Sequence, residues 1–594
     1  MSPSDTTTAL LGLADKGACP PFSDTGLSSV VRHFQVHPDN AAESVRTRGL
    51  VAHWPLDPAA IADLLPEPLA VDPEDRNVWF VARQSEQAIG PGRPSWADVE
   101  ETRWHEAAIM LPYVHDGKRG LFTWIRFHER DAAMLAGAYL GVPTKQARFT
   151  KTFPFVGQPL NRAMGVGTGC IMVASRFDAR VFTARFKAHT EHDPSSAEAA
   201  ALRSRLERVA GIRYLPDWAR PGSPAPVNDV VSWEVSGIEI ASCFAGDLDL
   251  ALASSDEDEL GLVSPADPAS VTGYFLDWSH GPTGPVTVVG GRPTEQLDGV
   301  RRAASGVVLQ GASTPLSPSG NAAISRSTDL GGKLGVQLRQ AGHVGMYVHW
   351  RADIEGVRKI LPPPFEVTEE SDRIWLFMNQ TQSGINQHGG HRPGPPGYLA
   401  DREPHHVNWH EAMFRIPCAV GGKKGYLLHV QYKDQDHALV FGMIDGYTTK
   451  RADFREYFRL YNGNGDGELA PGDRVGMHVS RHGAPIITAH LAVERELPEE
   501  ERESEGIRIF GVRHFPDLTT PQRDPLVHDI ISWKFANRRY RRAWAGNATI
   551  TFGDSDREEL HNLEPVEMLE SLFVHLEYQS GPGTGEILHD YLDA

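Results

Sequence analysis

Short runs in which β-branched or aromatic residues alternate with polar residues recur along the chain and predict β-strands. Four of the clearest are NVWFVAR from Asn77, RVFTARFKA from Arg180, GYLLHVQYK from Gly425 and DIISWKF from Asp529. Runs of this length and composition are typical of a sheet built from many strands.

Helical periodicity is rarer. DPAAIADLLP from Asp57 begins with a residue that can cap a helix and stops before a proline, and DIEGVRKILP from Asp353 does the same. A third stretch, DAAMLAGAYLG from Asp131, is also helix-like. The pattern predicts a β-rich α+β fold, a closed or nearly closed β-barrel with small flanking helices.

The chain repeats itself. Trp104-His105-Glu106-Ala107 matches Trp409-His410-Glu411-Ala412, and the match continues without a gap for 46 residues with 16 identities. Further matches lie on both sides, such as GIRYLPD with GVRHFPD. With 594 residues the chain is too long for one hydrophobic core, and the repeat predicts two copies of one domain.

We expect copy one at residues 45–292 and copy two at residues 340–594. Residues 293–339 are rich in Gly, Pro and Ser and are predicted to be a linker. Residues 1–44 have no counterpart in copy two and are predicted to be an N-terminal arm. The copies are expected to pack as an intramolecular pseudo-dimer, and a homo-oligomer of whole chains stays possible.

The composition of the chain limits the kinds of ligand that we expect it to bind. The net charge of −19 argues against nucleic acid and anionic membranes as ligands, and the basic run from Arg538 to Arg542 is interpreted as a strand or an interface edge. No apolar run is long enough to cross a bilayer, and the N-terminus lacks the pattern of a secretory signal, so a cytoplasmic protein is expected. The four cysteines form no CxxC pair and are expected to be buried and inert.

No metal or cofactor is predicted. Histidines cluster in copy two, but the stretch is interrupted by PGPPG and then enters a strand, which disperses the rings. Residues 384–403 are instead predicted to be a loop over the mouth of a pocket. The clustered histidines are His388, His391, His405, His406 and His410.

Several motifs occur together in each copy: an aromatic, one residue and Glu-Ala; a Gly-Lys-x-Gly turn; an Asp-x-Ala segment; and Gly-x-x-x-Gly followed closely by Lys-x-Ala. Together they resemble the acetoacetate decarboxylase family, over most of each copy. The resemblance implies two tandem β-barrel domains of that family. It also implies lyase chemistry in which a lysine amine forms an imine with a ketone, a mechanism known for the family rather than worked out from this sequence.

One departure limits that implication. The family has two adjacent lysines and the first forms the imine, but this chain has Thr144-Lys145 in copy one and Thr449-Lys450 in copy two. Neighbouring side chains in a strand point to opposite faces, so the lysines cannot enter the space that the threonines occupy unless a bulge re-aims them.

The resemblance assigns the active-site glutamate to Glu106 and Glu411. Trp104 and Trp409 should share their faces, and burial among aromatic groups is expected to raise the carboxyl pKa toward neutrality. A buried structural glutamate is the other interpretation. His410, like His105, is a candidate proton partner or an outward-facing residue.

The family also has a carboxylate-binding arginine after the first conserved aromatic. Copy two has Trp350-Arg351 there, but copy one has Trp54-Pro55. Copy two, with Arg351, Glu411 and Lys450, is therefore predicted to be the more complete site, and copy one, with Glu106 and Lys145, the less complete one.

The leading hypothesis is a cofactor-independent lyase of secondary metabolism, acting on an oxo-acid or polyketide-like carbonyl compound by decarboxylation, aldol-dehydration or a related proton transfer. Glu411 and Glu106 would move protons, Lys450 and Lys145 would supply charge, and Arg351, the threonines, the tryptophans and His410 would contact substrate. One alternative keeps the imine through Lys145 or Lys450. Another is a non-catalytic ligand-binding or scaffold protein.

Overall fold

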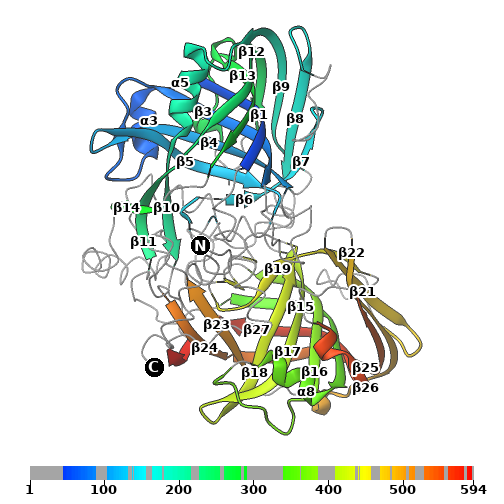
Figure 1. The fold of residues 1–594 in the computed structure, drawn as a ribbon. Coiled ribbons are helices and arrows are strands. Elements are labelled where there is room, and N and C mark those ends of the chain that lie inside the picture. The colour runs from blue at the N-terminus through cyan, green and yellow to red at the C-terminus, as the bar shows by residue number, and fades with distance from the viewer. Residues whose placement is uncertain are drawn as a thin grey trace, which may run out of the picture.

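The computed structural model describes most of residues 45–290 and 339–590, with internal gaps of which those longer than ten residues are 88–102, 216–226, 385–407, 457–468 and 516–526. The predicted arm and linker, the loop at 384–403 and most of the helix at Asp131 therefore lie outside the described residues. Copy one and copy two occupy opposite ends of the molecule, coloured blue to green and yellow-green to red (Figure 1).

Copy one is dominated by strands. Its elements are β1 (Val45–Pro55), α3 (Pro58–Leu64), β2 (Ala70–Val71), β3 (Asn77–Gln87), β4 (Arg103–His115), β5 (Lys118–His128), β6 (Thr144–Gln146), β7 (Arg148–Lys151), β8 (Gly169–Arg176), β9 (Ala179–His192), α5 (Ala197–Leu206), β10 (Arg208–Leu215), β11 (Val227–Glu234), β12 (Glu239–Leu252), η2 (Leu260–Leu262), η3 (Pro268–Ser270), β13 (Thr272–His280) and β14 (Thr287–Gly290).

Copy two repeats the plan. Its elements are β15 (Arg339–Ala352), α8 (Ile354–Ile360), β16 (Arg373–Gly384), β17 (Asn408–Val420), β18 (Lys423–Lys433), β19 (Thr449–Arg451), β20 (Asp453–Glu456), β21 (Arg474–Arg481), β22 (Ala484–Glu496), η4 (Glu499–Glu501), β23 (Arg508–Phe515), β24 (Val527–Lys534), β25 (Ala536–Phe552), η5 (Leu560–Leu563), β26 (Pro565–Met568), β27 (Ser571–Ser580) and β28 (Gly585–Asp590).

The four strands and the two capped helices that the sequence predicts are present. Asp57 accepts a hydrogen bond from the Ala59 amide at the start of α3, and Asp353 accepts one from the Glu355 amide at the start of α8. The basic run lies in β25, and the described cysteines, Cys170, Cys243 and Cys418, are buried. None of the helices among the described residues is long and apolar enough to cross a bilayer.

The two sheets have the same strand order. In copy one it runs β14-β11-β10-β5-β4-β3-β1-β13-β12-β9-β8-β7, and in copy two β28-β24-β23-β18-β17-β16-β15-β27-β25-β22-β21-β20. Short β6 pairs in parallel with β5, and β19 with β18. Identical order over this many strands confirms the duplication.

The expectation of a closed barrel is wrong for the described strands, because each order is an open path. The two end strands of each order, β14 and β7 in copy one, are not paired with each other. Both faces of the central strands are apolar: on β1, Leu50 belongs to the larger hydrophobic cluster and Val51 to a second cluster with Leu202 of α5. A sheet of this kind has to be covered on each side. We call the side of the larger cluster the major face and the other the minor face; in copy two they carry Ala412 and Met413 respectively.

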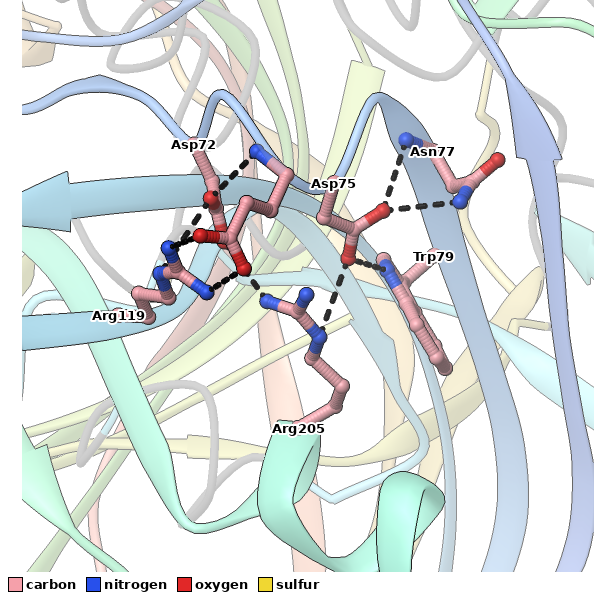
Figure 2. A network of polar contacts seen from close by, with 7 residues as sticks. Asp72, Asp75, Asn77, Trp79, Arg119 and Arg205 are labelled. Atoms are coloured by element: carbon pink, nitrogen blue, oxygen red, sulfur yellow. Dashed lines mark hydrogen bonds and ion pairs between the residues drawn. The ribbon is translucent and has the colours of Figure 1, made fainter. Parts of the chain in front are cut away.

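In copy one a network of charged side chains holds α5 against the minor face (Figure 2). Arg205 of α5 contacts buried Asp72 at 2.8 Å and Asp75 at 3.3 Å, and Asp75 accepts a hydrogen bond from the Trp79 indole at 2.9 Å. The positions equivalent to the two aspartates in copy two are threonine and serine, so the copies cover their minor faces with different chemistry.

Candidate active site

Glu106 lies on the minor face of β4 and is buried. Its Oε1 accepts hydrogen bonds from Arg83 Nε at 2.7 Å and from the Trp104 indole at 3.2 Å. Arg126 Nη1 of β5 lies 3.6 Å from Oε2. As the two-residue spacing predicts, Trp104 and Glu106 share one face, but the two arginines come from the neighbouring strands.

Thr144 shares this face. Its hydroxyl oxygen accepts a hydrogen bond from Arg126 Nε at 3.0 Å and donates one to the carbonyl of Val142 at 2.8 Å. Lys145 is the register partner of Phe127, a major-face residue, and is buried on that opposite side. The three pairs between β5 and β6 show no register shift, so no bulge there turns Lys145 toward Glu106.

The segment that carries Thr144 packs closely against the backbone of β10 through two glycines. Gly141 has a φ of +76°, and a Cβ added at Gly211 of β10 would lie 1.8 Å from the Gly141 carbonyl oxygen. Beside this contact, Arg213 Nε donates to Asp229 at 2.7 Å in a buried ion pair. Two glycines allow an approach that no side chain would permit.

Copy two builds the same support. Gly446 has a φ of +84° and packs on Gly511, and its carbonyl accepts a hydrogen bond from the Val512 amide at 2.7 Å. The adjacent buried ion pair is Arg513 with Asp529, at 2.8 Å. The position of the Thr-Lys segment is thus fixed in the same way in both copies.

Glu411 of β17 has different neighbours. Its carboxylate accepts hydrogen bonds from the side-chain amides of Asn379 at 3.2 Å and Gln431 at 3.1 Å, and from the Trp409 indole at 3.3 Å. Lys433 Nζ lies 3.9 Å from Oε2. Two amides stand where copy one has two arginines.

A buried histidine completes this group. His343 Nδ1 lies 3.4 Å from Glu411 Oε1 and 2.9 Å from the Asn379 side-chain oxygen. Thr449 is the register partner of Gln431 and so shares the face of Glu411, whereas Lys450 is paired with Tyr432 and is buried on the major face.

Both glutamates are ionised at neutral pH, against the expectation from the sequence. Burial alone would raise the pKa of Glu106, but the positive charges of Arg83 and Arg126 outweigh it and lower the pKa to about 2. Burial is likewise outweighed at Glu411, chiefly by Lys433, and its pKa is lowered. Cations brought by the neighbouring strands therefore decide the protonation state.

Arg351 is not brought together with Glu411. It lies on β15 six positions from Gly345, the residue paired with Asn379, which places it roughly 20 Å along the strand. Its guanidinium instead contacts Asp372 at 2.7 Å and Glu567 at 3.3 Å. The prediction that copy two has the more complete carboxylate site loses its structural basis, since Arg351 was the residue that distinguished it.

His105 and His410 follow the tryptophans but face the other way. Each ring donates a hydrogen bond from Nδ1 to a carboxylate, Glu129 at 2.9 Å and Asp434 at 2.7 Å. Each also stacks on a phenylalanine that packs against the larger cluster, Phe149 of β7 and Phe454 of β20, so these histidines belong to the major face and not to the glutamate site. Among the described residues, no group of three or more His, Cys, Asp or Glu side chains is arranged to hold a metal ion.

Six residues that contact the two glutamates were not predicted from the sequence: Arg83, Arg126, His343, Asn379, Gln431 and Lys433. The signal that could have found the arginines is the strand pairing itself, because Arg83 is the register partner of Glu106 and Arg126 that of Ala108, two residues further along β4.

Comparison with known proteins gives the family. The model of the acetoacetate decarboxylase family matches residues 21–283 and again residues 313–592. The chain belongs to the acetoacetate decarboxylase family. Two matched regions, with the two sheets of identical order, show that this family member is a tandem duplication of its domain.

Solved structures of the family are similar to parts of the chain. An acetoacetate decarboxylase-like enzyme from Sphingomonas wittichii RW1 is 22% identical, with a TM-score of 0.38, covering 44% of this chain and 97% of its own. The enduracididine biosynthesis enzyme MppR complexed with pyruvate is 19% identical, with a TM-score of 0.37, covering 47% and 98%. Acetoacetate decarboxylase from Legionella pneumophila is 15% identical, with a TM-score of 0.33, covering 44% and 90%. No curated protein matches the sequence.

Proposed function

We propose that this family member is a lyase acting on an oxo-acid or polyketide-like carbonyl compound, with Glu106 and Glu411 as the groups that move protons. One observation carries the proposal: in both copies a buried, ionised glutamate shares a sheet face with the threonine of the Thr-Lys pair. The family's chemistry needs a lysine where the threonines stand, so an imine route loses support on this face.

An ionised carboxylate accepts a proton before it can donate one. In the proposed step, Glu106 or Glu411 takes a proton from the carbon next to a carbonyl, and the released electron pair moves onto the carbonyl oxygen to form an enolate. Arg126 in copy one and Lys433 in copy two lie beside the carboxylate and can stabilise that negative charge. Lys433 thus takes the role that the sequence suggested for Lys450.

The test uses exchange of deuterium from heavy water into pyruvate and acetone, followed by proton NMR, because exchange reports proton abstraction whatever the full reaction is. Glu106→Gln and Glu411→Gln should each remove the exchange that their own copy carries, and the double variant should lose about 100-fold or more. Glu86→Gln is the matched control, since Glu86 pairs with Arg103 outside the site.

A double glutamine variant that is folded by circular dichroism and exchanges as fast as the natural protein would refute the proposal. Borohydride reduction in the presence of pyruvate tests the imine alternative separately. A mass increase on Lys145 or Lys450 would replace acid–base chemistry by an imine.

A further inference from the structure

The positions around the glutamate correspond one to one between the copies, but their charges differ. Strand register fixes the correspondence: Arg83 and Asn379 are paired directly with the glutamates, and so are His128 and Lys433 on the other side. The full sets are Thr47, Arg83, Arg126 and His128 in copy one, and His343, Asn379, Gln431 and Lys433 in copy two.

Copy one holds an excess of positive charge at this place. Two guanidinium groups flank one carboxylate. His128, the register partner of Glu106, accepts a hydrogen bond at Nδ1 from the Arg130 amide at 3.0 Å. In copy two the carboxylate lies 3.9 Å from Lys433 Nζ and 3.4 Å from His343 Nδ1, and the two positions that carry arginine in copy one carry the neutral amides of Asn379 and Gln431.

The cations of the two copies also differ in access. The side chains of Arg83 and Arg126 are 27% and 17% exposed, while Glu106 between them is 6% exposed. In copy two Lys433 is 5% and His343 1% exposed. The side chain of Arg83 therefore keeps contact with solvent, while burial lowers the pKa of Arg126 and the charged groups of copy two are almost fully covered.

We propose that the copy-one site takes substrates bearing a carboxylate, such as small oxo acids, which Arg83 and Arg126 hold, and that the copy-two site takes carbonyl compounds without a carboxylate. A guanidinium group offers paired N–H donors that match the two oxygens of a carboxylate. The amides of Asn379 and Gln431 can hydrogen-bond a neutral carbonyl compound but bring no charge. This inference rests on the proposed function, because it concerns the same two sites.

Substrate binding would also prepare the base in copy one. A carboxylate that draws Arg83 away from Glu106 removes one of the charges that hold the pKa of Glu106 low, so its affinity for a proton rises once an oxo acid is bound. A neutral ketone gives no such change. Selectivity and activation in copy one then come from the same two arginines.

The experiment separates the copies by exchange and measures binding independently. In the Glu411→Gln background only copy one can exchange, and pyruvate should be favoured over acetone; in the Glu106→Gln background the preference should reverse. Arg83→Asn with Arg126→Gln, which introduces the copy-two residues, should raise the KM for pyruvate about ten-fold or more. Arg103→Gln, a matched loss of one arginine outside the site, should leave it unchanged.

Calorimetric titration with pyruvate and acetoacetate gives the second readout, since binding does not need turnover. The inference is overturned if neither acid binds, if the paired arginine substitution leaves both affinities unchanged, or if pyruvate exchange depends on Glu411 and not on Glu106. Arginine-dependent binding combined with exchange that neither glutamate variant alters would instead refute the proposed function and keep the assignment of the anion site.

Discussion

At the scale of single residues, the same glutamate has been given two electrostatic settings. Glu106 lies between arginines, and Glu411 lies among amides, a histidine and a lysine. Both are ionised, but only the copy-one carboxylate is flanked by guanidinium groups. Four neighbouring positions differ between the copies, while the register of the carboxylate with its neighbouring strands stays the same.

The ionised state of Glu106 predicts a dependence of stability on acid. Its pKa is about 4.5 when unfolded and about 2 when folded, so the stabilisation is complete above pH 4.5 and is lost as the pH falls toward 2. Between pH 6 and pH 3, the natural protein should lose about 2 kcal/mol relative to Glu106→Gln. Urea unfolding at the two pH values measures this; an equal difference at both would show that Glu106 titrates normally.

The sequence could identify the two glutamates but not their state. The Trp-x-Glu spacing places both residues on one face, and this follows from strand geometry alone. The arginines that lower the pKa of Glu106 lie 23 and 20 positions away, on strands whose register only the folded sheet defines. The prediction that Arg351 joins the glutamate site was wrong for a related reason. Its place next to an aromatic residue does not tell how far along the 14-residue strand β15 it lies from the site.

At the scale of elements, sequence patterns predicted correctly those features that depend only on neighbouring residues. The two capped helices follow from their capping residues, and the four predicted strands follow from the alternation of apolar and polar residues. Barrel closure could not be predicted in this way, because it depends on whether the two end strands of the sheet, far apart in the sequence, pair with each other. Leu50 and Val51 are both apolar, and this part of the pattern does indicate a sheet that is covered on both faces.

One pair of strands in copy two carries a buried histidine pair that copy one lacks. His514 and His528 face each other with Nδ1 atoms 3.2 Å apart, where copy one has Tyr214 and Asn228. Burial, and at His514 the neighbouring ring, lowers the pKa values to about 3 and about 4. The unfolded chain takes up protons first, so stability is greatest above about pH 6.5 and falls as the pH decreases.

His514→Tyr with His528→Asn should therefore reduce the acid sensitivity of copy two. Between pH 7 and pH 5 each histidine should cost the natural protein about 2 kcal/mol, so the natural protein should lose about 4 kcal/mol more unfolding free energy than this variant. His561→Tyr, at an exposed position, is the control. Parallel curves for the natural and double-variant proteins would show that the pair does not titrate in this range.

At the scale of the whole molecule, the two copies meet at equivalent positions. Arg148 is the first residue of β7 and Asp453 is the first residue of β20, and the two positions are equivalent in the repeat. Their side chains lie 3.8 Å apart. In a two-fold symmetric pair a residue at the axis contacts its own equivalent, and on this basis we propose a pseudo-two-fold packing with the axis between the two side chains. Opposite charges avoid the repulsion that identical residues would cause there.

Cross-linking tests this packing. In a Cys19→Ser background, Arg148→Cys with Asp453→Cys should be joined within one chain by a short bismaleimide, giving a faster-migrating species on a denaturing gel. Asp453 lies beside the start of β22, through the pairing of both with Ser480 of β21, and Glu494 lies near the other end of β22. The pair Arg148→Cys with Glu494→Cys should therefore not be cross-linked. Equal cross-linking of both pairs would argue against a defined axis.

Duplication within one chain has a consequence for how the two glutamate sites can change. In a homodimer, every substitution appears in both subunits at once, so neither site can be altered while the other is kept. Here each site is encoded separately, and translation supplies the two in a fixed ratio of one to one. Arginines could replace amides, or the reverse, at one end of the molecule without any penalty at the other.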